Sequence, residues 1–180
     1  GGLGYIGSEL CKLYSGYSWH HNIKIIDKRF ISERVNQIRN WNMEFIQGDI
    51  LDKNIVEKHF KEADVVHHLA GITDVPRTKS ESTQERDKKI YEEAEIGTKN
   101  ILEVINNKCK IIFPSTHVVF EGTKDVKNDI KENEQTLPIL AYSKSKALNE
   151  KQLKKYAKNF VILRLGSVYG YSSGTMRVDI

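Results

Sequence analysis

Two groups of residues, at opposite ends of the chain, have types and spacings that could do chemistry. The chain opens Gly-Gly-Leu-Gly-Tyr-Ile-Gly, so that Gly1, Gly4 and Gly7 recur at every third position around Tyr5 and Ile6. Glycines ahead of a helix permit a tight turn, let the backbone approach a pyrophosphate and let the helix pack close to a sheet. The pattern predicts a loop that holds a dinucleotide, although glycine spacing alone is a weak signal.

The second group is Tyr142-Ser-Lys-Ser-Lys146. Tyr142 and Lys146 are four residues apart in a predicted helix, so they share one face of it. An ammonium beside a phenol favours the phenolate and lowers the tyrosine pKa from about 10 toward neutral pH. Such a phenolate is a general base for an alcohol. Taken alone, the pair could be two surface residues of a basic helix. The glycine loop upstream favours the interpretation that Tyr142 and Lys146 act together in proton transfer.

Acidic residues follow the next two apolar segments. Asp27 lies twenty residues after Gly7, at the end of a predicted strand. A carboxylate there accepts hydrogen bonds from ribose hydroxyls and repels a 2′-phosphate, unless it is only a turn residue. Lys28 and Arg29 follow it and leave room for the phosphorylated cofactor. Asp49 ends the next strand and could either reach an adenine amino group or cap a turn.

Small or hydroxylated residues follow the later strands. Ala70 and Gly71 allow a close backbone path beside a ligand. Ser115 and Thr116 follow the strand at 110–114, where ligands bind in parallel sheets, and one of their hydroxyls could bond a substrate oxygen.

These residues need a scaffold of alternating strands and helices. Expected strands are Ile23–Ile26, Met43–Gln47, Ala63–Leu69, Lys110–Pro114 and Phe160–Leu165, and expected helices are Tyr5–Tyr17, Asp52–Phe60, Gln84–Asn107 and Ala141–Lys158. Residues 30–42, 72–83 and 121–138 are expected to be loop, the first with a helical turn. This alternation predicts an α/β fold, a Rossmann-type doubly wound parallel sheet with helices on both faces.

A glycine loop of this kind is the turn out of a strand, yet here it is the first segment of the chain. In a sheet of order 3-2-1-4-5-6 the preceding strand is central, and without it the strands at 23–26 and 63–69 would face a gap. We therefore expect that the first strand and most of a C-terminal substrate domain are missing. Residues 1–170 would form the cofactor domain, residues 171–180 would begin the next, and the chain alone could be an inactive fragment.

Composition excludes several other classes. The net charge of +4 comes from lysines that suit a solvated helix face better than a nucleic-acid site, and no apolar run could cross a membrane. Cys11 and Cys109 suit buried packing in a reducing, cytoplasmic setting. His20-His21 and His67-His68 are adjacent pairs whose side chains point apart on a strand, so we expect no metal.

The ordered set of motifs resembles the NAD-dependent epimerase/dehydratase family of extended short-chain dehydrogenases/reductases, most of all its nucleotide-sugar epimerases. The motifs are the glycine loop, Gly-Asp-Ile at 48–50, His-Leu-Ala-Gly at 68–71, Ile-Gly-Thr-Lys-Asn at 96–100, Pro-Ser-Thr-His-Val-Val-Phe at 114–120, the Tyr142/Lys146 pair and Leu-Arg-Leu-Gly-Ser-Val-Tyr-Gly at 163–170.

The resemblance implies roles for single residues. Thr116 corresponds to the catalytic Ser/Thr, Tyr142 to the base, and Lys146 to the lysine that also holds the nicotinamide ribose. Asp27 corresponds to the ribose ligand, Asp49 and Ile50 to the adenine contact, and Leu69 to Thr73 to the stretch beside the pyrophosphate and nicotinamide. NAD is the implied cofactor and a nucleotide sugar the substrate; a homodimer of the full-length protein stays open.

The chain also departs from the family pattern. Ala94 and Ser167 stand where asparagines are usual, and His117-Val118 replaces the Asp-Glu that serves water elimination in dehydratases. Two alternatives to an epimerase remain: an NADP-dependent keto-sugar reductase, and a non-catalytic dinucleotide-sensing regulator. The Tyr142/Lys146 pair argues against the regulator, and the cofactor preference separates the other two.

Overall fold

Helices and strands alternate along the chain, as the sequence predicts. The computed structural model describes residues 1–17, 22–73, 78–124 and 129–171. The helices are α1 (Tyr5–Ser15), α2 (Ser32–Asn40), α3 (Lys53–Phe60), α4 (Gln84–Val104) and α5 (Ala141–Tyr156), with short 3₁₀ turns η1 (Lys79–Glu81) and η2 (His117–Phe120). The strands are β1 (Lys24–Asp27), β2 (Glu44–Gln47), β3 (Val65–His67), β4 (Lys110–Thr116) and β5 (Phe160–Leu165).

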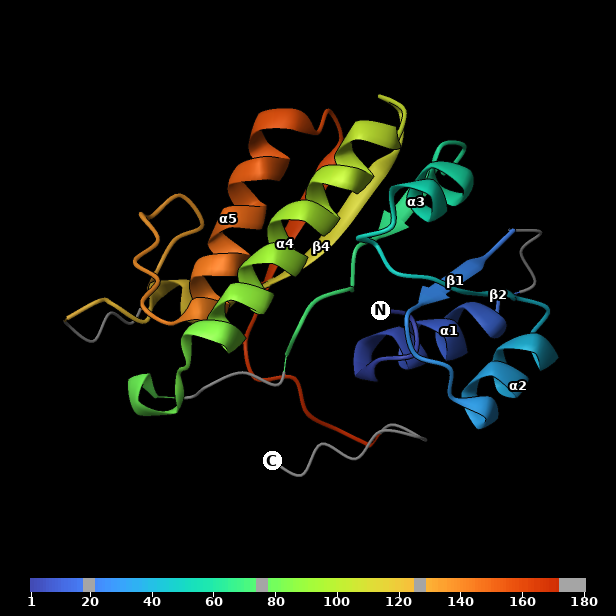
Figure 1. Cartoon of the computed structure of the whole chain (residues 1–180), viewed down its shortest axis with the longest axis horizontal. Helices are drawn as coiled ribbons and strands as arrows, with labels where there is room; N and C mark the ends of the chain where they lie inside the picture. The colour runs from blue at the N-terminus through green and yellow to red at the C-terminus, as the bar shows by residue number, and fades with distance from the viewer. Residues whose placement is uncertain (18–21, 74–77, 125–128, 172–180) are drawn as a thin grey trace.

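All strand pairs are parallel, and they form two sheets. β1 pairs with β2, and β4 lies between β3 and β5. Over the residues that the structure describes, no ladder joins β1 to β3, as expected for the strands at 23–26 and 63–69. Figure 1 shows β1 and β2 on one side of the N-terminus and β4 with its helices on the other.

Strand β3 shows that helices cover both faces. Neighbouring side chains on a strand point to opposite faces. Val66 packs with Val56 of α3 and Ile101 of α4, whereas His67 bonds the Tyr14 hydroxyl of α1 through Nε2 at 2.9 Å. Helix α1 therefore lies across the sheet from α3 and α4, which confirms the α/β fold with two helical layers. Helices α4 and α5 lie side by side over β4 (Figure 1).

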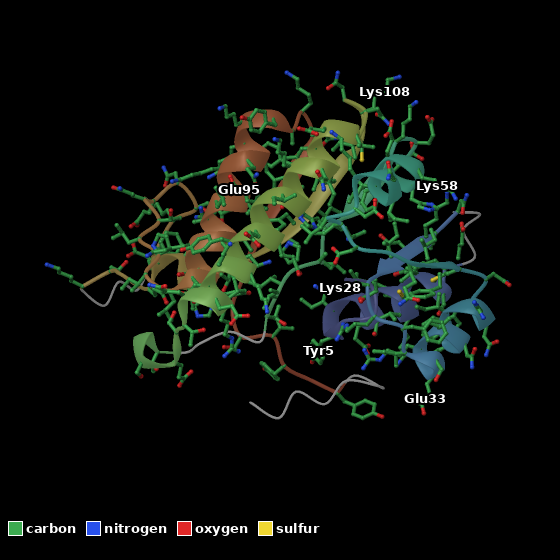
Figure 2. The ribbon with its side chains drawn as sticks, in the orientation of Figure 1. Tyr5, Lys28, Glu33, Lys58, Glu95 and Lys108 are labelled. Atoms are coloured by element: carbon green, nitrogen blue, oxygen red, sulfur yellow. The ribbon has the colours of Figure 1, made fainter. Side chains whose placement is uncertain are left out.

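Apolar side chains gather in three clusters. One joins α1, α2 and β1 around Leu3 and Val35, the second joins α3, β3 and α4, and the third packs Leu153 of α5 on Phe113 of β4. Both cysteines are buried and unpaired, as expected. Charged side chains such as Lys58, Glu95 and Lys108 point outward (Figure 2). None of the described helices has the length and apolar character that crossing a bilayer requires.

The loop expected at 30–42 is wrong in part, because residues Ser32–Asn40 form helix α2. This helix is mostly polar, and its two buried side chains are Val35 and Ile38. They pack against Leu3 and Met43, so tertiary packing supplies what the local sequence lacks. The expected cap of α3 is confirmed, because the Asp52 carboxylate accepts the N–H groups of Asn54 and Ile55.

Candidate cofactor and active site

The glycine loop, residues 1–7, lies between the carboxyl end of β1 and the residues that follow β3. The backbone nitrogens of Gly1 and Gly2 donate to the Ile26 carbonyl at 2.8 and 3.3 Å. A Cβ atom on Gly1 would lie 2.5 Å from the Ala70 nitrogen. A Cβ atom on Gly7 would lie 2.5 Å from the Gly2 carbonyl oxygen. Only glycine allows these approaches, so the loop has the close packing that a dinucleotide cradle requires.

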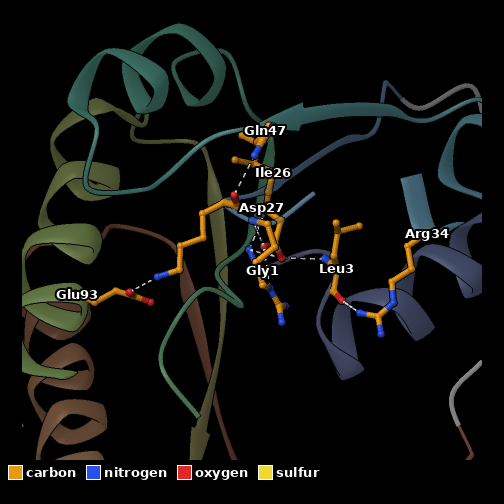
Figure 3. Close-up of polar contacts among 9 residues, drawn as sticks. Gly1, Leu3, Ile26, Asp27, Arg34, Gln47 and Glu93 are labelled. Carbon is orange, nitrogen blue, oxygen red and sulfur yellow. Dashed lines mark hydrogen bonds and ion pairs between the residues drawn. The ribbon is translucent and has the colours of Figure 1, made fainter. Parts of the chain in front are cut away.

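Asp27 is almost fully buried at the end of β1 (Figure 3). One carboxylate oxygen accepts the Leu3 N–H at 3.0 Å, and the other accepts the Arg29 N–H at 3.0 Å. Burial opposes ionisation of Asp27, whereas the hydrogen bonds from the Arg29 and Leu3 N–H groups favour the carboxylate and lower its pKa. The carboxylate therefore stays ionised and fixes the loop, and its remaining lone pairs can accept further hydrogen bonds.

A cavity of about 260 Å³ opens beside Asp27. It brings together eight of the residues predicted to bind the cofactor: Gly1, Asp27, Lys28, Asp49, Ile50, Ala70, Gly71 and Thr73. Glu93 of α4 also lines this cavity, and it was not predicted from the sequence. Nothing in the sequence distinguishes Glu93 from its acidic neighbours on that helix; only the packing of α4 identifies it.

Tyr5 and Ile6 do not line this cavity. They belong to a second hollow, of about 720 Å³, between α1 and residues 168–171. The Tyr5 hydroxyl donates to the Gly170 carbonyl at 2.6 Å. Tyr5 and Ile6 therefore face the segment after β5, whereas Gly1 faces Leu69 and Ala70.

The loop after β2 is fixed on α4. Asp49 accepts the Leu51 N–H at 3.0 Å, which is the turn-capping alternative left open by the sequence. Ile50 is buried, and its carbonyl accepts the Asn100 amide at 2.9 Å. A Cβ atom on Gly97 would lie 2.2 Å from Ile50 Cδ1, so glycine lets this loop lie close to the helix.

The two hydroxyls after β4 have different surroundings. Ser115 donates to Glu150 at 2.6 Å, inside the protein. Arg164 of β5 donates to the same carboxylate through Nε at 2.9 Å and Nη2 at 2.7 Å. Thr116 ends β4, and its hydroxyl accepts the Val118 N–H at 3.3 Å. Because Ser115 is engaged by a buried carboxylate, Thr116 is the better candidate for a substrate contact.

Glu150 and Arg164 are further residues that the sequence analysis did not single out. A signal existed for Glu150, since it lies one helical turn beyond Lys146 and therefore on the same face of α5.

Lys146 lies against the strand that carries the hydroxyls. Its Nζ donates to the Pro114 carbonyl at 3.0 Å and lies 4.6 Å from the centre of the Phe113 ring. The same Nζ is 5.9 Å from the centre of the Tyr142 ring, in the first turn of α5. Burial lowers the pKa of Lys146 to about 8. Both side chains of the pair are partly buried, and an ammonium near a phenol favours the phenolate.

The adjacent histidines diverge, as expected from their place on a strand. His67 bonds Tyr14, and His68 Nε2 bonds the Thr98 hydroxyl at 2.9 Å on the opposite side. In the ranges that the structure describes, no three potential metal-binding side chains cluster. The other pair, His20-His21, lies outside the described residues.

Comparison with known proteins decides the family. The sequence model of the NAD dependent epimerase/dehydratase family matches residues 1–179. This chain belongs to that family. The family's dependence on NAD confirms the cofactor expected from the glycine loop and Asp27, and the close-packed glycines and buried carboxylate fit such a group.

The relatives that the chain matches are named for different reactions. The chain is 30% identical to a dTDP-D-glucose 4,6-dehydratase of Dictyostelium discoideum, over 94% of this chain and 43% of that protein. It is also 30% identical to a putative UDP-glucose 4-epimerase of Methanocaldococcus jannaschii, over 94% of this chain and 55% of that protein. The chain thus spans about half the length of these relatives.

A solved structure shares the fold. The UDP-glucuronic acid 4-epimerase of Bacillus cereus, solved in complex with NAD, superposes with a TM-score of 0.77 at 28% identity, over 94% of this chain and 55% of that one. The expected Rossmann-type architecture is therefore confirmed.

Proposed function

We propose that the chain is the cofactor-binding part of a nucleotide-sugar epimerase in which Tyr142 is the general base. The observation that carries this proposal is the partly buried Lys146, which donates to the Pro114 carbonyl of β4 and lies near Tyr142. A cofactor-binding protein without catalysis has no need for a partly buried ammonium beside a phenol, since removing a charge from water is costly. This pair therefore favours the enzyme over the dinucleotide-sensing regulator.

Bound NAD would supply the hydride acceptor and donor for a sugar carbon. Tyr142 would take the proton of the sugar hydroxyl and later return it, with Lys146 favouring the phenolate. Thr116, at the end of β4, would hold the same substrate oxygen by a hydrogen bond. Asp27 would hold the adenosine ribose, and Asp49, Ile50 and the segment Leu69–Thr73 would lie along the rest of the cofactor.

Two features favour an epimerase over the related reactions. His117 and Val118 follow Thr116, so the paired carboxylates for water elimination are absent at these two positions; His117 instead bonds the Leu165 carbonyl at 3.2 Å. The cations that could favour NADP, Lys28 and Arg29, both contact carboxylates. These contacts argue against the NADP-dependent reductase.

In this proposal residues 1–170 are the cofactor domain. Residues 171–180, all but the first of which lie outside the described part, would begin a substrate domain. The substrate is a nucleotide sugar, and the sugar and base stay open.

The test is incubation of the full-length protein, including its proposed substrate domain, with NAD and UDP-glucose or UDP-glucuronic acid, followed by analysis of the sugar. A parallel incubation contains NADPH and a nucleotide keto-sugar. Inversion at one carbon with no net NADH supports the epimerase. Loss of water would indicate a dehydratase, and net oxidation of NADPH in the parallel incubation would indicate a reductase. NAD binding by the full-length protein without turnover of any nucleotide sugar would indicate a regulator.

A further inference from the structure

Both cations that follow Asp27 are paired with carboxylates. Arg29 Nε lies 3.4 Å from an Asp27 oxygen. Lys28 donates from the end of β1 to Glu93 of α4, which is 65 residues further along the chain (Figure 3). The Glu93 side chain is only 10% exposed, whereas that of Lys28 is 49% exposed. Figure 2 shows Lys28 lying toward the middle of the molecule, unlike Lys58 and Lys108.

We propose that Glu93 is a cofactor-specificity residue, which holds the Lys28 ammonium away from the adenosine ribose and so disfavours a 2′-phosphate. The proposal rests on the cofactor site described above. It assigns to α4 a part of the discrimination between NAD and NADP that Asp27 alone would otherwise provide.

Lys28 could bind a phosphate if it were released from Glu93. A lysine that follows the ribose-binding carboxylate can make a charge-assisted hydrogen bond to a 2′-phosphate. To do so here it must leave Glu93, whose largely buried carboxylate would then lose its cation. The same carboxylate lines the cavity together with Asp27 and Asp49, so an incoming phosphate would also meet three acidic groups.

Glu93 cannot follow Lys28 toward solvent, because α4 is fixed on this side. One turn further along α4, Gly97 packs closely against Ile50, and two turns further, Asn100 donates to the Ile50 carbonyl. The ion pair therefore has one rigid partner and one movable partner. The rigid carboxylate determines where the movable ammonium lies.

The experiment measures dissociation constants for NAD and NADP by titration of the full chain and its variants. Glu93→Gln should bind NADP about tenfold more tightly than the wild type, since a charge-assisted bond is gained, with NAD affinity within about threefold. The double variant Glu93→Gln with Lys28→Met should bind NADP no more tightly than the wild type. Glu92→Gln is the matched control, because Glu92 is exposed on the same helix and pairs with Lys88.

Unchanged NADP affinity in Glu93→Gln, or a gain that survives Lys28→Met, would overturn the role of Glu93. If Glu93→Gln does not fold, Lys28→Met alone decides. Unchanged NADP binding supports the proposal, and a tenfold loss shows that Lys28 already reaches the phosphate and overturns it. A wild type that binds neither nucleotide would instead refute the cofactor site, and this proposal with it.

Discussion

Lys146 Nζ donates a hydrogen bond to the Pro114 carbonyl oxygen, 3.0 Å away. This contact ties the helix that carries Tyr142 to the strand that ends at Thr116. Burial lowers the pKa of Lys146 to about 8, so the ammonium form persists at neutral pH and is poised to influence the phenol. Tyr142 and Thr116, which are proposed to act on one substrate oxygen, are therefore positioned by the same hydrogen bond between Lys146 and Pro114.

The first prediction concerns the base. Tyr142→Phe should lower turnover of the nucleotide sugar by about 10²–10⁴, the usual contribution of a general base, and leave NAD affinity within about threefold. Turnover and NAD titration are measured on the same preparation. Tyr156→Phe is the control, since Tyr156 ends the same helix and is exposed. Near-normal turnover by Tyr142→Phe would remove Tyr142 from the mechanism.

The second prediction concerns Asp27. Asp27→Asn keeps the shape of the side chain and removes its charge, so NAD affinity should fall about tenfold, as for loss of a charged hydrogen bond. NADP affinity should fall less, because the variant side chain no longer repels the 2′-phosphate. The ratio of the NADP to the NAD dissociation constant should therefore decrease. Titration with both nucleotides checks this. Asp64→Asn, at an exposed position before β3, should change neither affinity. An undiminished NAD preference in Asp27→Asn would show that the carboxylate is not the ribose ligand.

The sequence predicted that residues at the ends of several strands lie together at the cofactor site. Parallel strands place their carboxyl ends at one edge, so Asp27, Asp49 and Ala70 were expected together, and they line one cavity. Tyr142 and Lys146 followed from helical spacing in the same way. Both predictions depend only on the local periodicity of strands and helices, which can be read from the sequence.

Residues brought in by tertiary packing could not be predicted. Glu93 meets Lys28 across 65 positions, and its helix carries other acids with the same local surroundings. Residue types alone left Ser115 and Thr116 equivalent, because they do not say which of the two meets Glu150; only the family resemblance singled out Thr116. Helix α2 was missed since its stability comes from Val35 and Ile38 packing on other elements.

The third prediction concerns the buried network of Glu150, Arg164 and Ser115. Burial opposes ionisation of Glu150, but hydrogen bonds from Arg164 and Ser115 outweigh it and lower its pKa. Glu150→Gln leaves the Arg164 guanidinium without its counter-charge, so the free energy of unfolding should fall by about 3 kcal/mol. Urea denaturation measures this, with the exposed Glu57→Gln of α3 as control. A loss below about 1 kcal/mol would mean that the network contributes little to stability.

The fourth prediction concerns His68, which is buried between β3 and α4. Burial, and then the nearby Lys146 ammonium, lower the pKa of His68 from 6.5 to about 3. Between these two values the unfolded chain binds a proton that the folded chain does not, so stability falls as the pH is lowered. The slope for one such group is about 1.4 kcal/mol per pH unit.

Denaturation at several values between pH 7 and pH 5.5 keeps most of the losses from Asp27 and Glu150 out of the measured range, because the pKa of each carboxyl is lowered by folding. Burial also lowers the pKa of His59 and His67, which add to the wild-type slope. His68→Gln can keep a hydrogen bond to Thr98 without a titrating group, so its stability should depend less on pH than that of the wild type. The exposed His117→Gln should keep the wild-type slope. Equal slopes in His68→Gln and the wild type would show that His68 is protonated in the folded protein without cost, and hence that its site is open to water.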